Sequence, residues 1–348
     1  MIRDEQLDAA VAQGIIDADQ AARLRDFVKR GPRHVDVNER AADPDDEKFR
    51  LIGGFNDVFV SIGVLLLVAA LFGLASQFGF GGGFAFLAMI VAWGLSEFFS
   101  RHMRLALPSI VLAAMFAGAG AFVGASFGAA ALGENATLVF SGLGGALAAF
   151  LHERRFRVPI DNAIAAAGIV CAVAGVLYLV APDWMRVHSA IPIAVLGLAV
   201  FALAVRVDAS DVTRQTRRAD VAFWLHMLSA PMIVHAVVPL IAGDTGEIDT
   251  AQALLILALF VLLGIVALVI DRRALLISGL AYAGIAIAYL LSQSIGEGLR
   301  LSVTLLGLAV VVLGLSAGWR SLRRILLPLL PLGGLARYVP PVHLSDAR

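Results

Sequence analysis

Charged residues are scarce in this sequence of 348 amino acids, of which 16% are Asp, Glu, Lys or Arg and 59% are hydrophobic. A soluble domain carries about a quarter charged residues, so this composition indicates a membrane protein. Lysine is nearly missing, with two lysines against 25 arginines, a bias typical of GC-rich bacterial genomes. The formal net charge is zero, which excludes a polybasic protein, and we expect no nucleic-acid partner.

Cysteine occurs once, at Cys171, inside an apolar run. A single thiol excludes an internal disulfide, a CxxC redox pair and a thiolate zinc site. A signal-peptide pattern is also missing, because the N-terminal segment MIRDEQLDAAVAQGIIDADQ is acidic and polar. We therefore expect the first spanning helix to direct the chain to the membrane.

Long apolar runs are the feature that this sequence has in abundance. From residue 54 onward, ten runs long enough to cross a hydrocarbon core of about 30 Å follow one another. Water is missing from that core, so every backbone polar group must be paired within its own segment, which predicts helices. The predicted spans cover residues 54–78, 83–99, 105–128, 135–151, 160–181, 189–206, 219–242, 251–270, 274–292 and 300–318.

Arginine alternates between the connections that join these spans. Every second connection is arginine-rich, and the others together hold only Arg186 and Arg300. Positively charged residues favour the cytoplasmic side, so the arginine-rich connections and both chain termini are expected in the cytoplasm. The eleven arginines of these connections are Arg101, Arg104, Arg154, Arg155, Arg157, Arg206, Arg214, Arg217, Arg218, Arg272 and Arg273.

The predicted fold is thus all-α: a polytopic membrane helix bundle with ten transmembrane helices over residues 53–318, in a bacterial inner membrane. Four arginine-bearing segments begin helix pairs at a spacing of roughly 54–62 residues: RHMRLALPSIVLA, RRFRVPIDNAIAA, RRADVAFWLHML and RRALLISGLAYAG. This pattern favours repeated helical hairpins. Any chain with short arginine-bearing connections would show a similar pattern, so both interpretations stay open. Residues 319–348 are predicted to hold an interfacial helix, beginning at Trp319, and a C-terminal tail.

Residues 1–30 are predicted to form a small cytoplasmic helical hairpin. Asp17 and Gln20 have the spacing of a capping box at the start of its second helix. The few apolar residues of the hairpin cannot form a self-sufficient core, so it needs the membrane domain, a second copy of the chain or another protein as a partner. Residues 31–52 are polar and charged, which predicts a flexible linker.

The segment LDAAVAQGIIDADQAARLRDFV resembles the start of bacterial membrane proteins grouped as domain of unknown function 2157. The likeness consists of a helix, a Gly-Ile pair, an Asp-x-x-Gln sequence and a second helix, and it covers about the first thirty residues. It implies a short cytoplasmic hairpin ahead of eight or more hydrophobic segments. It implies no catalytic or ligand-binding residue.

Polar residues near the ends of the spans could form a functional site. Together with two histidines of the seventh span, they predict a polar pathway or cytoplasmic vestibule formed by Asn56, Asp57, Glu97, Asp161, Asn162, Asp220, His226 and His235. For the aspartates, helix capping is favoured over a vestibule, because carboxylates at helix N-termini accept hydrogen bonds from free N–H groups. Glu97 lies at a helix C-terminus, where Arg101 at i+4 offers an ion pair.

His226 and His235 are nine residues apart, so a regular helix turns them by about 900° and places them on opposite faces. They cannot share one metal ion. Neutral histidines hydrogen-bonded between packed helices are one interpretation, and a proton or ligand relay is another. No other spacing fits a metal or catalytic motif. We therefore expect no catalytic residue, no cofactor, no metal site and no enzymatic activity.

Small residues recur at i+4 spacing in neighbouring spans. In lipid, such residues let two helix backbones approach closely, which predicts helix-packing seams. Whether a seam joins helices of one chain or of two copies stays open. The predicted seam residues are Gly120, Gly124 and Gly128 in span three, Ser141, Gly145 and Ala149 in span four, and Ala167, Cys171 and Gly175 in span five.

Three classes of function remain. A membrane enzyme that acts on lipids is the least supported, because no acid–base or metal motif is evident. A non-catalytic scaffold or regulatory protein is favoured slightly, because the N-terminal hairpin needs a docking partner. A transporter- or channel-like permease for a small neutral or weakly polar solute is the alternative, since ten helices and proline-containing spans are typical of transporters. Expected partners are membrane lipids and, through residues 1–30, a second copy or another protein. A polar cavity reaching the midplane near His226 or His235 would favour transport, whereas a solid core would favour the scaffold.

Overall fold

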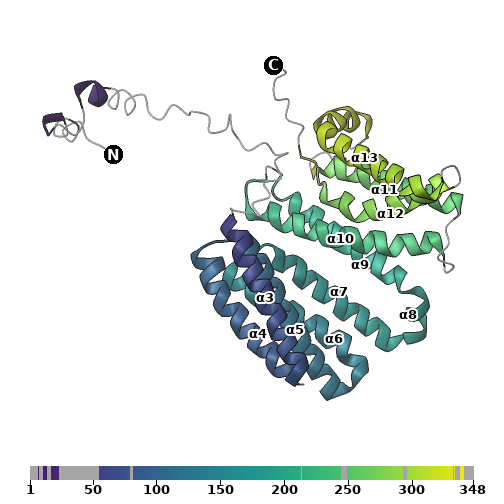
Figure 1. Cartoon of the computed structure of the whole chain (residues 1–348), viewed down its shortest axis with the longest axis horizontal. Coiled ribbons are helices and arrows are strands. Elements are labelled where there is room, and N and C mark those ends of the chain that lie inside the picture. The colour runs from purple at the N-terminus through teal and green to yellow at the C-terminus, as the bar shows by residue number, and fades with distance from the viewer. Residues whose placement is uncertain are drawn as a thin grey trace. The chain divides into compact units, whose positions relative to one another are not determined.

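The computed structural model of the chain (Figure 1) describes residues 7, 11–13, 17–22, 55–78, 81–212, 214–243, 249–292, 296–331, 333 and 338–340. Two compact units divide the chain, residues 1–48 and residues 49–348. Within the described ranges, all regular secondary structure is helical.

The first unit contains the capping box predicted from sequence. The Asp17 backbone N–H donates to Gln20 Oε1 at 3.1 Å, and the Gln20 backbone N–H donates to Asp17 Oδ1 at 2.7 Å. Leu7 and Ala21 are buried. Most of the predicted hairpin and the whole predicted linker lie outside the described residues.

Ten helices in the described part of the second unit are long and apolar enough to cross a membrane. The predicted all-α bundle of ten spans is confirmed, and the chain is a multi-pass membrane protein. The helices are α3 (Phe55–Phe78), α4 (Gly81–Ser96) with the π-helix η1 (Glu97–His102), α5 (Ala106–Leu132), α6 (Thr137–Phe156), α7 (Ile160–Val180), α9 (Ala190–Asp208), α10 (Arg217–Ala242), α11 (Thr250–Ile270), α12 (Ala274–Ser292) and α13 (Glu297–Leu326).

Three shorter elements complete the described helices: η2 (Glu134–Ala136), α8 (Pro182–His188) and η3 (Leu327–Leu329). The connection after α7 was not predicted to contain a helix, yet Pro182 begins α8 there, as its fixed φ suits the first helical turn. We call the end of the second unit that carries the connections 103–105, 157–159, 209–216 and 271–273 the arginine end.

Helices that follow one another in the chain pack as neighbours (Figure 1). α4, α5, α6 and α7 pack in chain order, α3 packs against both α4 and α5, and α9 pairs with α10. α11, α12 and α13 form a third group, which α10 contacts chiefly through α12 and also through α11. α7 contacts both α9 and α10, so it joins the first five spans to the rest.

Small residues set the distances between α5, α6 and α7. A Cβ atom built on Gly124 of α5 would lie 2.1 Å from the Phe140 carbonyl oxygen of α6. On Gly142 of α6, a Cβ would lie 2.4 Å from the Ala172 backbone nitrogen of α7. These separations are shorter than van der Waals contact, so only glycine permits them. The predicted seams join helices within one chain.

The register of the first seam differs by one residue from the prediction. Gly120, Gly124 and Gly128 meet α6 chiefly at Phe140, Gly144 and Ala148, and not at Ser141, Gly145 and Ala149. Gly145 still faces α5, with its Cβ position 3.2 Å from Ala121 Cβ, and Ala149 is buried. The i+4 pattern of α6 contains two adjacent small-residue rows, and periodicity alone does not separate them.

The arginine-rich connections share an uncommon backbone conformation. Four described residues other than glycine have positive φ: Arg104 at 55°, Arg157 at 56°, Arg214 at 53° and Asp271 at 58°. One lies in each connection of the arginine end, at intervals of 53, 57 and 57 residues by their numbers. This recurrence supports the interpretation of the spans as repeated helix pairs.

The C-terminal prediction needs a correction. A separate interfacial helix was expected to begin at Trp319, but α13 continues without a break to Leu326, where η3 and Pro328 follow. Trp319 is only 2% exposed. Its indole N–H donates a hydrogen bond to the Asp271 carboxylate inside the protein.

Candidate functional site

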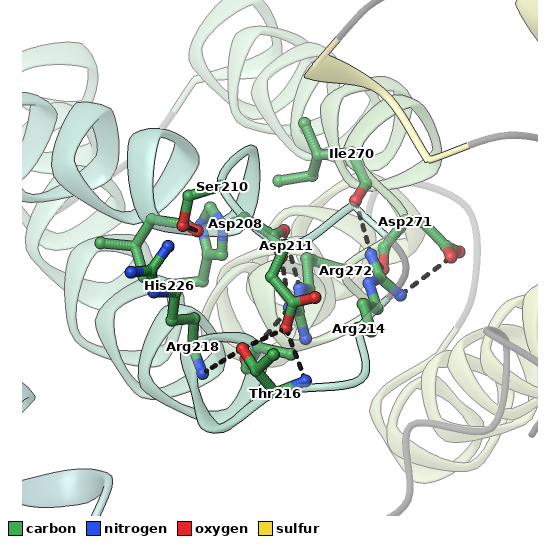
Figure 2. A network of polar contacts seen from close by, with 12 residues as sticks. Asp208, Ser210, Asp211, Arg214, Thr216, Arg218, His226, Ile270, Asp271 and Arg272 are labelled. Atoms are coloured by element: carbon green, nitrogen blue, oxygen red, sulfur yellow. Dashed lines mark hydrogen bonds and ion pairs between the residues drawn. The ribbon is translucent and has the colours of Figure 1, made fainter.

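Buried charged residues gather at the arginine end, where α9, α10, α11 and α13 terminate or begin (Figure 2). Asp208, at the end of α9, accepts two hydrogen bonds from Arg272, from Nε at 3.0 Å and from Nη2 at 2.6 Å. Arg272 Nη2 also donates to the Ala219 carbonyl oxygen of α10 at 3.1 Å. This forked pair fixes the α11–α12 connection against α9 and α10.

Asp271 is the centre of the second part of this network. It ends α11 in the left-handed conformation, which aspartate tolerates better than most residues, and its carboxylate is 3% exposed. Arg214 Nη1 donates to Oδ2 at 3.0 Å, and Trp319 Nε1 donates to Oδ1 at 2.7 Å. Arg323 Nη1 lies 3.2 Å from Oδ2. One carboxylate therefore joins α11 to α13 and to the α9–α10 connection.

The last carbonyl groups of α11 have no partners within the helix, and guanidinium groups bond to them instead. Arg214 Nη2 donates to the Ile270 and Asp271 carbonyl oxygens at 3.0 and 2.9 Å. Arg323 Nε donates to the Leu268 carbonyl oxygen at 2.8 Å, and its Nη2 donates to the Pro340 carbonyl oxygen at 3.0 Å. Arg214 and Arg323 thus donate hydrogen bonds or ion-pair contacts to the Asp271 carboxylate and also to the unpaired carbonyl groups at the end of α11.

The α9–α10 connection is ordered by Asp211. Its Oδ2 accepts hydrogen bonds from the Thr216 backbone N–H at 2.8 Å and hydroxyl at 2.7 Å (Figure 2). The Thr216 hydroxyl oxygen in turn accepts the Arg218 backbone N–H at 3.2 Å, which caps α10. This turn holds Arg214 in position for Asp271.

His226 lies beside the Asp208–Arg272 pair and is fully buried. Its Nε2 is 3.8 Å from Asp208 Oδ2, which is too long for a hydrogen bond, and neither ring nitrogen has a hydrogen-bond partner inside the protein. The Phe201 ring meets it edge-on at 5.4 Å. His235 is exposed and packs edge-on against Tyr282 at 5.3 Å, so the prediction of opposite faces is confirmed.

A second buried cluster joins α4, α6 and α7. Ser96 Oγ lies 3.0 Å from His152 Nε2, and His152 Nδ1 lies 2.7 Å from Asp161 Oδ2. All three side chains are fully buried, and Phe116 and Phe156 pack on the imidazole with ring centroids 5.6 and 4.6 Å away. Asp161 Oδ1 has no hydrogen-bond partner. The order Ser–His–Asp is that of a serine hydrolase relay.

Ion pairs at the surface connect the clusters around α6. Glu97 pairs with Arg101 at 3.1 Å, as its i+4 spacing predicted, and also with Arg155 at 2.7 Å. Glu153 accepts a hydrogen bond from Arg217 of α10 at 2.8 Å. Since His152, Glu153 and Arg155 all lie on the last turn of α6, this turn contacts charged groups from three other elements.

The residues of the predicted vestibule fall into different environments. Asp57 and Asp161 are buried, Asn56 and Asp220 are exposed, and Asn162 donates to the Pro159 carbonyl oxygen at 3.4 Å. Asp161 was considered as a helix cap, but its carboxylate bonds to His152.

Two of the hollows in the described part of the chain are lined by apolar side chains, except at Tyr282. An open groove of about 350 Å³ lies between α6 and α7. A second gap, between α10, α11 and α12, is too narrow to hold a water molecule. None of the eight predicted vestibule or pathway residues lines either of them.

Sequence reasoning missed Ser96, His152, Asp208, Asp271 and the role of Trp319. Asp208 and Asp271 both lie directly at the arginine-rich connections, which was the one available signal that these acids pair with arginines. Among the described residues, no group of three or more His, Cys, Asp or Glu side chains is arranged to hold a metal ion. We found no family model, curated protein or solved structure that matches this chain.

Proposed function

We propose that this membrane protein is a non-catalytic scaffold or regulatory protein. The observation that supports the proposal is the buried network at the arginine end, where ion pairs and a hydrogen bond join α9, α10, α11 and α13. Removing one partner of a buried ion pair is costly, so such a network favours one arrangement of the helix ends. A constant arrangement suits a protein that presents a surface to a partner.

A transporter- or channel-like permease for a small neutral or weakly polar solute is the second candidate. The unpartnered ring nitrogens of His226 favour it, because they could bind a solute if the surrounding helices separated. A permease also needs a polar route to such a site from each side of the membrane. His226 is fully buried and lines neither cavity, which favours the scaffold over the permease.

The Ser96–His152–Asp161 cluster requires a direct test of the non-catalytic proposal. A serine nucleophile must reach a carbonyl group of its substrate, whereas the Ser96 side chain is fully buried. We expect a fluorophosphonate probe to leave Ser96 unlabelled in the intact protein, measured by peptide mass spectrometry. Labelling that disappears in Ser96→Ala would show a reactive serine and would overturn this part of the proposal.

The site of action is proposed to be the inner membrane of a bacterium, with the arginine end and both termini in the cytoplasm. The alternation of arginine between connections supports this orientation. A regulatory partner would then meet the arginine end and the N-terminal unit in the same compartment.

Co-purification from native membranes tests the scaffold proposal. The full chain and a variant lacking residues 1–30 would be extracted in mild detergent, and their retained proteins quantified. We expect a stoichiometric partner with the full chain and its loss from the truncated variant. Proteoliposomes that take up a small neutral solute, without any retained protein partner, would support the permease and contradict the scaffold.

A further inference from the structure

One face of α6 carries a row of exposed apolar side chains that ends at an arginine. Leu143, Leu147 and Phe150 are 50%, 59% and 47% exposed. With Arg154 they follow the spacing i, i+4, i+7, i+11, so they lie on a single helix face. Within a membrane, such a row contacts lipid hydrocarbon, and Arg154 lies at its polar end.

Arg154 differs from the neighbouring Arg155 in its partners. Arg155 is paired with Glu97 at 2.7 Å. Arg154 is exposed, and its guanidinium carbon lies 4.6 Å from the centroid of the Phe150 ring. No carboxylate pairs with Arg154 in the part of the chain that the structure describes. Its N–H donors are therefore free to bind an anion directly above the apolar row.

The apolar groove between α6 and α7 continues this row toward the middle of the membrane. Leu143 belongs to the row and also lines the groove. The volume of the groove is about 350 Å³. The groove forms beside the close crossing of the two helices at Gly142, with Ala172 as part of its lining. Eleven residues separate Leu143 from Arg154, or about 16 Å along the helix. Half of a hydrocarbon core is about 15 Å, so a lipid tail that starts at Arg154 reaches the groove.

We propose that α6 and α7 bind one anionic phospholipid from the leaflet at the arginine end. Arg154 binds the phosphate, and one acyl chain lies along Leu147 and enters the groove beside Leu143 and Val173. Guanidinium groups bind phosphate oxygens in a forked geometry. A zwitterionic headgroup would also need an acidic partner for its ammonium group. The nearby Glu97 and Glu153 are already bonded to arginines, which favours an anionic headgroup.

Lipid retained by the full-length protein tests this site independently of the proposed scaffold role. The protein would be reconstituted in nanodiscs of phosphatidylcholine with phosphatidylglycerol, extracted in mild detergent, and its bound lipids counted by native mass spectrometry. We expect one retained phosphatidylglycerol per chain. Arg154→Gln should weaken binding about fivefold, since one arginine near the membrane surface contributes about 1 kcal/mol. Val173→Trp should also lower retention by filling the groove from its exposed side.

Arg218→Gln is the matched control, because Arg218 is also exposed at the arginine end but lies on α10, away from the groove. It should retain lipid as the unchanged protein does. If Arg154→Gln and Val173→Trp retained as much phosphatidylglycerol as the unchanged protein, at unchanged thermal stability, the proposal would be overturned. Equal retention of phosphatidylcholine would overturn the anionic preference. Displacement of the lipid by inorganic phosphate alone would overturn the role of the acyl chain.

Discussion

At the scale of single residues, the Asp271 carboxylate contacts three buried side chains at the arginine end. Asp271→Ala would leave Arg214, Arg323 and the Trp319 N–H facing an apolar side chain. Removing one partner of a buried ion pair costs about 3–5 kcal/mol, so we expect a clear fall in the free energy of unfolding. Thermal unfolding in detergent measures it.

Asp183→Ala provides the comparison for Asp271→Ala. Asp183 also pairs with an arginine, Arg186, but its side chain is 88% exposed. Exposed ion pairs contribute about 0–1 kcal/mol, so this variant should unfold at nearly the original temperature. Similar losses in both variants would show that the buried network does not stabilise the arginine end.

Asp161 offers a second test at this scale. Asp161→Asn keeps an oxygen that can accept the His152 Nδ1–H and adds an amide group toward the position where Oδ1 has no partner. Asp161→Ala leaves the imidazole without that acceptor, at a cost of about 1–3 kcal/mol. We expect the alanine variant to unfold at a lower temperature than the asparagine variant. Equal losses in the two variants would mean that the carboxylate charge, and not a neutral hydrogen-bond acceptor, stabilises the cluster.

Local pairs were predictable from sequence, whereas distant pairs were not. The Asp17–Gln20 capping box and the Glu97–Arg101 pair follow from spacings of three and four residues. The Asp208–Arg272 pair spans 64 residues, and Ser96 and His152 are 56 residues apart. Their contacts depend on how helices pack, which hydrophobic periodicity does not specify. A polar residue near a span end is compatible with capping, solvent or a buried partner.

At the scale of helices, Gly124 tests the packing of α5 against α6. Gly124→Leu would force a side chain into the space occupied by the Phe140 carbonyl group and the Gly144 Cα. Overpacking costs about 1–3 kcal/mol in well-packed sites, and more where only backbone atoms can move. We expect a lower unfolding temperature in detergent.

Gly118→Leu is the matched substitution on the same helix, because a Cβ at Gly118 meets nothing within 4 Å. Its unfolding temperature should stay close to that of the unchanged protein. Leucine has a higher helix propensity than glycine, so propensity alone lowers the stability of neither variant. If Gly118→Leu and Gly124→Leu destabilised the protein equally, the close α5–α6 contact at Gly124 would not be the cause of the loss.

The positions of the helices were largely predictable, because the apolar runs that define them are long. All ten spans occur, with bounds that differ from the prediction by a few residues at most ends. The larger difference is at α13, where the charged stretch after residue 318 was read as a separate helix. Arg323 and Trp319 instead bond to buried groups at the end of α11. α13 therefore continues as one helix through both residues, with their side chains directed into the protein. A charged residue at the end of a span contacts either solvent or a buried group of the protein, and the sequence alone does not distinguish the two.

At the scale of the whole molecule, the alternation of arginine and the recurrence of left-handed residues describe the same feature. Each arginine-rich connection turns through one residue of positive φ, and the helix pairs between these turns repeat at similar lengths. The sequence indicated this repeat but did not reveal its structural counterpart, because arginine and aspartate occupy the left-handed positions where glycine would be the usual signal.

The orientation of the bundle is the property that every proposed partner contact requires. The single native cysteine makes it measurable: Cys171→Ala removes the only thiol, and single cysteines can then be introduced at exposed positions. Arg218→Cys lies at the arginine end, and Asp183→Cys lies on α8 at the opposite ends of the helices. In intact cells, a membrane-impermeant maleimide should label the second variant and spare the first until the inner membrane is opened. Labelling of Arg218→Cys from outside would show the opposite orientation. The buried network would then lie on the far side of the membrane from any cytoplasmic partner.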